Sequence, residues 1–212
     1  MKVGFQYRQM YEPTWLGVPI IQFPGDMVML AELIWKLKPD IIIETGVAHG
    51  GSAIFFASIL ELIGKGRVVA IDVEIRQYNR IAIQAHQLSK RIQLIEKDSL
   101  DRDLETILTP LCEEKTTMVF LDSSHSYEHV LEEMDMYGRY VTAGSYMVVM
   151  DGIQQNLSDT PRGNPEWIDD NPLRAIHKFL ETNSSFWRCD RYYERLLITC
   201  APHGFLQKTS ID

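Results

Sequence analysis

Short apolar runs alternate with helical patterns through most of this 212-residue chain. The runs are rich in β-branched residues, which favour buried strands, and the segments between them have the apolar spacing of amphipathic helices. The predicted strands cover residues 41–45, 68–72, 92–95, 118–122 and 146–151, and the intervening helices cover 51–63, 76–88, 102–112 and 127–140. Such a repeat predicts an α/β fold with a mainly parallel sheet and helices on both faces.

The last part of the chain has a different order of elements. A helix is predicted over residues 173–182, and two strands follow it at 186–192 and 196–200 without a helix between them. Consecutive strands joined directly form a hairpin, so one of them must run antiparallel to its neighbour. We therefore expect a Rossmann-like, seven-stranded sheet that is parallel except for a C-terminal antiparallel hairpin.

A glycine-containing loop follows the first strand with the pattern E-x-G-x-x-x-G-G, from Glu44 through Gly46 to Gly50 and Gly51. Glycines at a strand-to-helix turn let the backbone turn sharply and approach a ligand closely. The pattern differs from the G-x-G-x-x-G loop that holds a pyrophosphate. Its carboxylate suits a ligand with an ammonium group and no phosphates, and S-adenosylmethionine fits that description. A purely structural turn is the alternative.

Acidic residues close or follow each of the predicted parallel strands. They are Glu44, Asp72, Asp98, Asp122 and Asp151. Because the carboxyl ends of parallel strands share one edge of the sheet, we expect these carboxylates to face one crevice. Asp72 is placed to accept the ribose hydroxyls of a nucleoside cofactor, and Asp98 with Ser99 to lie beside the adenine. Helix capping and simple solvation are the alternatives for any single acid.

The segment from Asp122 to Glu128, D-S-S-H-S-Y-E, contains the strongest candidates for catalysis. The imidazole of His125 is suited to take a proton from a hydroxyl nucleophile. Asp122 and Asp151 form a credible pair of ligands for Mg²⁺, which would lower the pKa of a substrate hydroxyl. A metal-free site with His125 alone as base is the alternative. A zinc pair of His125 and His129 is conceivable, although the H-E-x-x-H glutamate is missing.

Composition restricts the remaining classes of function. The chain has 21 basic and 29 acidic residues, a net charge of −8 and no basic cluster, which argues against a nucleic-acid partner. Three scattered cysteines form no CxxC pair, and we find neither a signal peptide nor a transmembrane run. We expect a cytoplasmic protein, with residues 1–38 as a lid or as the interface of a homo-oligomer and residues 39–212 as the cofactor-binding domain.

The chain resembles the cephalosporin hydroxylase / rhamnosyl O-methyltransferase family of class I S-adenosylmethionine-dependent methyltransferases. The motifs that carry this resemblance are Trp15-Leu16-Gly17, Glu44-Thr45-Gly46 with Gly50-Gly51-Ser52, Asp122-Ser123-Ser124-His125, Asn171-Pro172-Leu173 and Pro202-His203-Gly204-Phe205-Leu206. The resemblance implies methyl transfer to a hydroxyl of a small molecule, sugar or glycolipid. It also implies a cofactor site, at Glu44, Gly46, Gly50, Gly51, Ser52 and Asp72, and metal ligands at Asp122 and Asp151. Asp122 also belongs to the expected cofactor set.

One departure from the pattern concerns the metal. Similar enzymes carry a second carboxylate or amide beside the last metal aspartate, whereas Asp151 lies between Met150 and Gly152. The third ligand is therefore missing or comes from elsewhere, and a scaffold that binds the cofactor without catalysis is one alternative function. The other is an NAD(P)-dependent oxidoreductase, which the absence of G-x-G-x-x-G and of a Tyr-x-x-x-Lys pair disfavours.

Two segments are expected to cover the substrate. The N-terminal stretch is rich in aromatic residues, with Tyr7, Tyr11, Trp15 and Phe23, and ordinary core packing is the alternative for each ring. The stretch from Gly152 to Asn171 lacks an apolar period, and loops of that length inside a domain are usually functional or disordered. It leaves the sheet directly after Asp151. The residues of this loop that we expect to meet the acceptor are Arg162, Trp167, Asp169 and Asp170.

Overall fold

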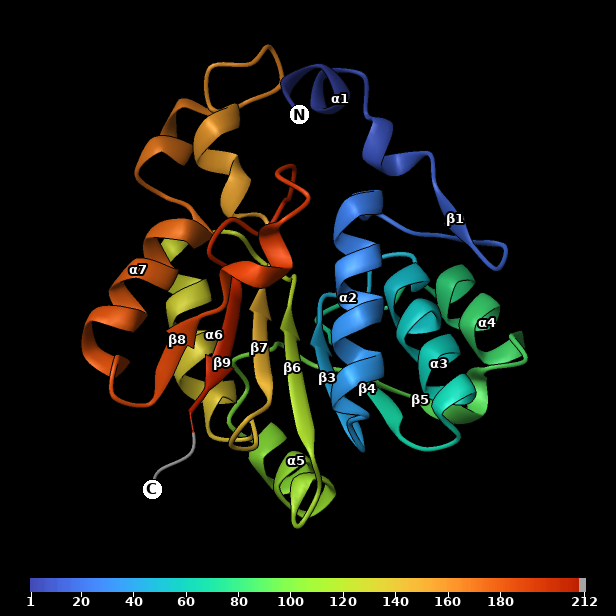
Figure 1. Cartoon of the computed structure of the whole chain (residues 1–212). Coiled ribbons are helices and arrows are strands. Elements are labelled where there is room, and N and C mark those ends of the chain that lie inside the picture. The colour runs from blue at the N-terminus through green and yellow to red at the C-terminus, as the bar shows by residue number, and fades with distance from the viewer. Residues whose placement is uncertain (210–212) are drawn as a thin grey trace.

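The computed structural model describes residues 1–209 and contains one large sheet of seven strands in the order β5-β4-β3-β6-β7-β9-β8 (Figure 1). The strands are β3 (Ile41–Thr45), β4 (Arg67–Asp72), β5 (Ile92–Glu96), β6 (Thr117–Leu121), β7 (Tyr146–Val149), β8 (Trp187–Cys189) and β9 (Phe205–Lys208). Strands β3 to β7 are mutually parallel, and the chain order reverses between β3 and β6. A ligand crevice is expected at the carboxyl ends of the strands at such a reversal.

The antiparallel end of the sheet confirms the expected hairpin but not all of its residues. β9 runs antiparallel to both β7 and β8. The last strand was predicted at 196–200, and that prediction is wrong, because these residues form a loop and the strand lies at Phe205–Lys208. Leu197 is 91% exposed, whereas Phe205 and Leu206 are fully buried. The apolar run therefore lies at the surface, and the sheet is completed by the next apolar pair along the chain.

Helices cover both faces of the sheet, as predicted. They are α2 (Pro24–Leu37), α3 (Gly51–Ile63), α4 (Gln77–Ala85), α5 (Leu104–Cys112), α6 (Tyr127–Gly138) and α7 (Pro172–Asn183). Because side chains alternate along a strand, Ile42 packs with α2 and α3 on one face, while Ile41 and Ile43 pack with α5, α6 and α7 on the other. The core thus lies in two layers, one on each side of the sheet.

The N-terminal segment extends above the carboxyl ends of the strands before α2 joins the core (Figure 1). It contains α1 (Lys2–Gln6), a 3₁₀ turn at Gln9–Tyr11 and the short hairpin of β1 (Thr14–Trp15) with β2 (Val18–Pro19). Helix α2 begins at Pro24, a residue that suits the first helical position because it has no N–H to leave unpaired. Asp26 in its first turn accepts a hydrogen bond from the Cys200 N–H at 2.7 Å, which ties α2 to the C-terminal loop.

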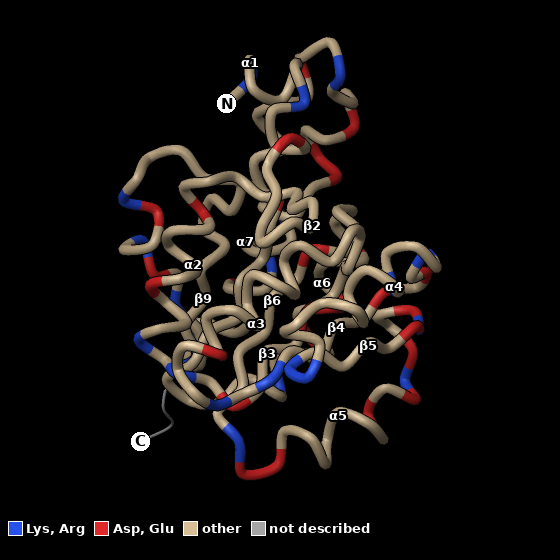
Figure 2. Tube along the Cα trace, turned by 90° about the vertical axis from the view of Figure 1, so that its right-hand side faces the viewer, with Lys and Arg blue, Asp and Glu red and all other residues tan. Residues whose placement is uncertain are grey.

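Charge is spread over the molecule, with acidic and basic residues interspersed along most of the trace (Figure 2).

Short 3₁₀ turns complete the chain at Ser89–Arg91, Gly152–Leu157, Pro165–Ile168 and Arg191–Glu194. Within residues 1–209, none of the helices has both the length and the apolar character required to span a bilayer.

Candidate active site

The glycine loop after β3 is shaped by close contacts within the protein. Gly46 has φ +88°, and a Cβ at this position would lie 2.1 Å from the main-chain oxygen of Asp122. Gly50, at φ +87°, faces the side chain of Ile83, and a Cβ on Gly51 would lie 2.2 Å from the carbonyl oxygen of Pro19. Only glycine fits such a conformation and such close packing. The glycines therefore bring the ends of β3 and β6 together and seat the start of α3 against the N-terminal segment.

Asp72, at the end of β4, holds this loop in place. Its Oδ2 accepts hydrogen bonds from the N–H groups of Val47 at 2.7 Å and Ala48 at 3.1 Å, and its Oδ1 accepts one from Glu74. Hydrogen bonds to a charged acceptor are among the stronger ones in proteins. Asp72 thus fixes the main chain of the loop, while its side chain also lines a neighbouring cavity.

Two cavities adjoin along the glycine loop. A smaller one of about 330 Å³ includes Asp72, Asp98 and Ser99 in its wall, and a larger one of about 460 Å³ includes His125 and Asp151. The wall that they share consists of Gly46, Ala48, Asp122 and Ser123. Four of the five predicted strand-end acids, Asp72, Asp98, Asp122 and Asp151, therefore line one crevice. The prediction is wrong for Glu44, which is buried beneath the loop.

A third hollow, of about 660 Å³, lies at the opposite edge of the sheet. It is more open and is bordered by Asp40, Arg67 and Lys115, which precede or begin strands. Ligands of open α/β sheets bind at the carboxyl ends of the strands. We therefore assign the functional site to the two adjoining cavities, although the third hollow is the largest of the three.

Glu44 lies beneath the loop and lines neither of the adjoining cavities. Its side chain is completely buried, and within the part of the chain that the structure describes neither carboxylate oxygen has a hydrogen bond of good geometry, although the Ser52 hydroxyl lies close by. Burial raises the pKa of Glu44 to about 8, which the hydroxyl of Ser52 partly offsets and the charge of Asp72 increases. Ser52 itself faces the larger cavity. A buried acid without a partner is unusual in a structural role, because unpaired buried polar groups cost free energy.

A polar network behind the smaller cavity was not predicted. The Nε2 of His129 lies 3.1 Å from the Ser99 hydroxyl and 3.2 Å from the Ser123 hydroxyl, and Ser123 donates to Glu133 at 2.7 Å. Glu133 is fully buried and raises the pKa of His129. His129 and Glu133 are four residues apart on α6, a spacing that also occurs on solvated helix faces. The spacing of His129 and Glu133 alone could therefore indicate either a buried network or an exposed pair. The tertiary fold decides between them, because it places Ser99 and Ser123 beside His129.

The residues proposed for catalysis form one cluster at the ends of β6 and β7. One donor atom each of Asp122, His125 and Asp151 can be chosen so that all three lie within 4.8 Å of one another. The Nε2 of His125 is 3.3 Å from Oδ2 of Asp151. Burial, followed by the charges of Asp151 and Glu44, raises the pKa of Asp122 well above its usual value. His129 faces the smaller cavity rather than this cluster, so it does not complete a metal pair with His125.

Gln22 is a further site residue that sequence reasoning missed. Its Nε2 donates a hydrogen bond to Oδ2 of Asp122 at 2.7 Å, and its own side-chain oxygen is buried without a partner in the described residues. Gln22 comes from the segment between β2 and α2, so its approach to Asp122 depends on how the N-terminal segment folds over the sheet. The periodicity of the sequence carries no signal for such a contact.

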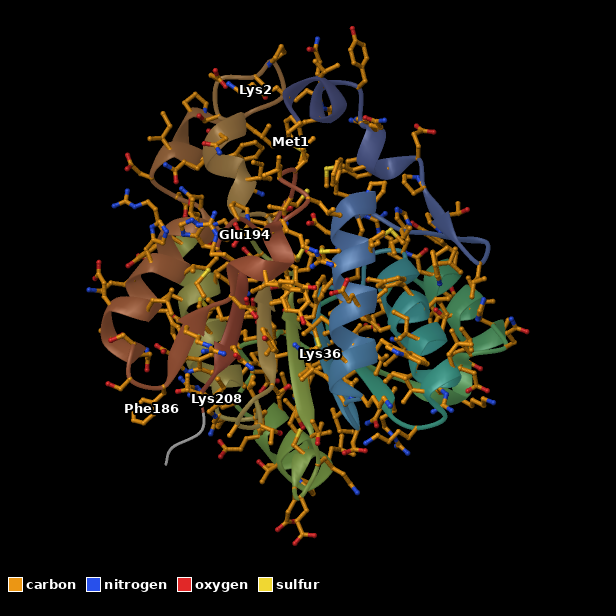
Figure 3. The ribbon with its side chains drawn as sticks, in the orientation of Figure 1. Met1, Lys2, Lys36, Phe186, Glu194 and Lys208 are labelled. Atoms are coloured by element: carbon orange, nitrogen blue, oxygen red, sulfur yellow. The ribbon has the colours of Figure 1, made fainter. Side chains whose placement is uncertain are left out.

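The N-terminal segment and the loop after β7 approach each other beyond the carboxyl ends of the strands (Figure 1), and residues of both line the larger cavity. The rings of Phe5 and Trp167 pack edge to face with centroids 6.0 Å apart, and Lys2, labelled at the top of Figure 3, forms an ion pair with Asp159. Arg162 and Trp167 line the cavity as expected. Asp169 and Asp170 do not, because Asp169 pairs with Arg174 and Asp170 accepts a hydrogen bond from the Tyr127 N–H.

The aromatic residues of the N-terminal segment have different surroundings. Tyr11 lines the larger cavity. Trp15 instead packs on Phe55 and donates a hydrogen bond to the Ser58 hydroxyl at 3.0 Å, which is core packing on α3. Tyr7 is 73% exposed. Phe23 packs against the core. Of the four predicted rings, Tyr11 is therefore the one that lines the larger cavity, and Phe5, which was not predicted, lines it as well.

Comparisons with known proteins agree with this arrangement. The model of a family described as Rhamnosyl O-methyltransferase/CmcI matches residues 7–209. A rhamnosyl O-methyltransferase of Mycobacterium leprae (strain TN) is 33% identical over 197 residues, which cover 91% of this chain and 82% of that protein. An apo structure of CmcI has a TM-score of 0.69 at 19% identity and covers 95% of this chain and 78% of its own. A CmcI structure with Mg and SAM has a TM-score of 0.65 at 18% identity, with coverages of 94% and 78%. The structural likenesses confirm the predicted fold.

Proposed function

Because this chain belongs to the Rhamnosyl O-methyltransferase/CmcI family, we propose that it transfers a methyl group from S-adenosylmethionine to a hydroxyl of a sugar. Membership confirms the family that the sequence motifs indicated, and with it the expected class of enzyme. The proposal extends this class to a sugar acceptor, which the name of the Mycobacterium leprae relative supports.

The observation that carries the proposal is the meeting of two cavities at Gly46 and Asp122. Asp72, Asp98 and Ser99 line the smaller cavity, which supports a role for Asp72 toward the ribose hydroxyls and for Asp98 and Ser99 toward the adenine. The larger one, next to Ser52, has room for the amino acid portion of the cofactor and for an acceptor. The cofactor, when bound, supplies an electrophilic methyl group. Glu44 does not line either cavity, but it lies next to Ser52, which lines the larger one, and a buried carboxylate without a partner in the described residues would be stabilised by an ammonium bound on that side.

The acceptor would lie in the larger cavity against the Asp122–His125–Asp151 cluster. This cluster can hold a hydroxyl and receive its proton. The buried side-chain oxygens of Gln22 and Gln154, which also lack partners in the described residues, are suited to accept hydrogen bonds from further hydroxyls of a sugar. The N-terminal segment and the Gly152–Asn171 loop would exclude water and fix the acceptor oxygen in line with the methyl group.

The same cluster fits a divalent cation. Asp122 and Asp151 provide carboxylate oxygens, and neither forms an ion pair with a lysine or arginine within residues 1–209. A bound cation would lower the pKa of the acceptor hydroxyl. The sequence led us to expect Mg²⁺, and the CmcI structure with Mg and SAM supports a divalent cation as part of this proposal. Assembly as a homo-oligomer and location in the cytoplasm stay predictions.

The first test is binding and turnover. Calorimetry should detect binding of S-adenosylmethionine, and methyl transfer should occur to rhamnosides within a panel of glycosides. Asp151→Asn is expected to lower turnover by about 100-fold or more while changing the Kd of S-adenosylmethionine by less than about threefold, because the aspartate acts on the acceptor. Asp103→Asn, at an exposed position before α5, is the matched control. Binding of the cofactor without methyl transfer to any glycoside would contradict the proposed function and favour a non-catalytic scaffold.

A further inference from the structure

The imidazole of His125 faces two carboxylates across a small gap. Its Nε2 lies 3.3 Å from Oδ2 of Asp151, and a donor oxygen of Asp122 completes a group within 4.8 Å. Neighbouring ligands of one octahedral ion are about 3 Å apart, so small side-chain rotations would bring the three donors onto a common ion. The donors come from the end of β6, the turn after it and the end of β7, and they border the larger cavity on one side.

The surroundings of this group favour a cation. Gln22 donates a hydrogen bond to Asp122 at 2.7 Å, as the neighbours of metal-binding carboxylates commonly do, and its buried oxygen lacks a partner in the described residues. Met150 and Gly152, which flank Asp151, have no side-chain oxygen to offer. Among the histidine, cysteine, aspartate and glutamate side chains that the structure describes, His125 is the one that supplies a third donor within 4.8 Å of both aspartates.

We propose that His125 is a ligand of a divalent metal ion held with Asp122 and Asp151, and that this centre selects Mn²⁺ over Mg²⁺. Mg²⁺ strongly prefers oxygen ligands, whereas first-row transition ions accept imidazole nitrogen readily. The Nε2 atom cannot hold a cation and accept the proton of the acceptor hydroxyl at the same time. The assignment therefore replaces the role of His125 as a base, and an acceptor hydroxyl whose pKa the ion lowers would release its proton to water in the larger cavity. The role of the ion in methyl transfer depends on the proposed function. The binding of the ion depends only on the geometry of Asp122, His125 and Asp151.

The experiment measures metal binding to the full chain without cofactor or acceptor. We expect the wild type to bind Mn²⁺ at least about tenfold more tightly than Mg²⁺ in calorimetric titrations. Pulsed electron paramagnetic resonance of bound Mn²⁺ should show a ¹⁴N coupling from a directly bound imidazole. In His125→Ala the ¹⁴N coupling should disappear, and the Mn²⁺ affinity should fall at least about tenfold, with a change in Mg²⁺ affinity of less than about threefold.

Two further variants test whether the ¹⁴N coupling belongs to His125. His177→Ala removes one ring of the surface pair formed with His203, so the coupling should persist in that variant. His125→Asn serves as a second variant if alanine prevents folding, and thermal melting establishes that each variant is folded. A wild type that binds no Mn²⁺, or a ¹⁴N coupling that survives in His125→Ala, would overturn the proposal. Titration with S-adenosylmethionine in parallel separates this failure from a failure of the proposed function.

Discussion

Replacing Gly46 by alanine is expected to destabilise the protein by about 3 kcal/mol or more and to abolish binding of S-adenosylmethionine. At φ +88° an L residue pays roughly 1–2 kcal/mol for its backbone conformation. The added methyl group would also lie 2.1 Å from the main-chain oxygen of Asp122, where backbone rather than a flexible side chain would have to move. Separating the ends of β3 and β6 would distort the wall that the two cavities share.

Gly64 provides a matched control for this prediction. It has φ +86° at the end of α3, and nothing lies within 4 Å of a Cβ built there. Gly64→Ala should therefore lose only the conformational part, about 1 kcal/mol, and should keep its affinity for the cofactor. Denaturant unfolding and calorimetry on both variants measure the difference. Equal loss of stability in the two variants would mean that the contact between Gly46 and Asp122 is unimportant.

Much of the fold could be predicted because its strands are continuous apolar runs. Strand β3 at Ile41–Thr45 has the predicted bounds. Each of the other four parallel strands, β4 to β7, begins and ends within two residues of its own predicted bounds. The last strand could not be located in this way. Leu196 to Ile198 and Phe205 with Leu206 are both short apolar runs, and only the packing of β9 between β7 and β8 decides which of them is buried.

The candidate site also has features that could be predicted from the sequence and features that could not. Four of the five strand-end acids share the crevice as predicted, because a parallel sheet places its carboxyl ends at one edge, whereas Glu44 points into the buried interior. The hydrogen bond from Gln22 to Asp122 joins residues 100 positions apart and depends on tertiary folding. The glycine pattern indicated a close approach correctly, but Gly46 and Gly51 approach other parts of the backbone. The local sequence thus predicts which strand ends lie together at the site. Which side chains contact one another there depends on tertiary packing.

Glu44→Gln is expected to stabilise the protein without ligand and to weaken its binding of S-adenosylmethionine. The pKa of Glu44 is about 8 in the fold, whereas its ordinary value is 4.5. Between these values the folded state binds more protons than the unfolded state, so stability falls as the pH rises from 4.5 to 8 and is constant above. The shift corresponds to at most about 5 kcal/mol. Glutamine cannot ionise, so the advantage of the variant should be near zero at pH 4.5 and largest above pH 8.

Urea unfolding at pH 5, 7 and 9 measures this advantage. Glu133→Gln is the control, because Glu133 is also fully buried but has His129 and Ser123 as partners, so its substitution should destabilise the fold. If the ammonium of the cofactor faces Glu44, wild-type affinity should increase from pH 6 to pH 8 as the carboxyl ionises. The variant should lose this pH dependence and bind about tenfold or more weakly at pH 8. Unchanged affinity and an unchanged pH profile in Glu44→Gln would place the ammonium elsewhere and leave the buried carboxyl without a functional reason.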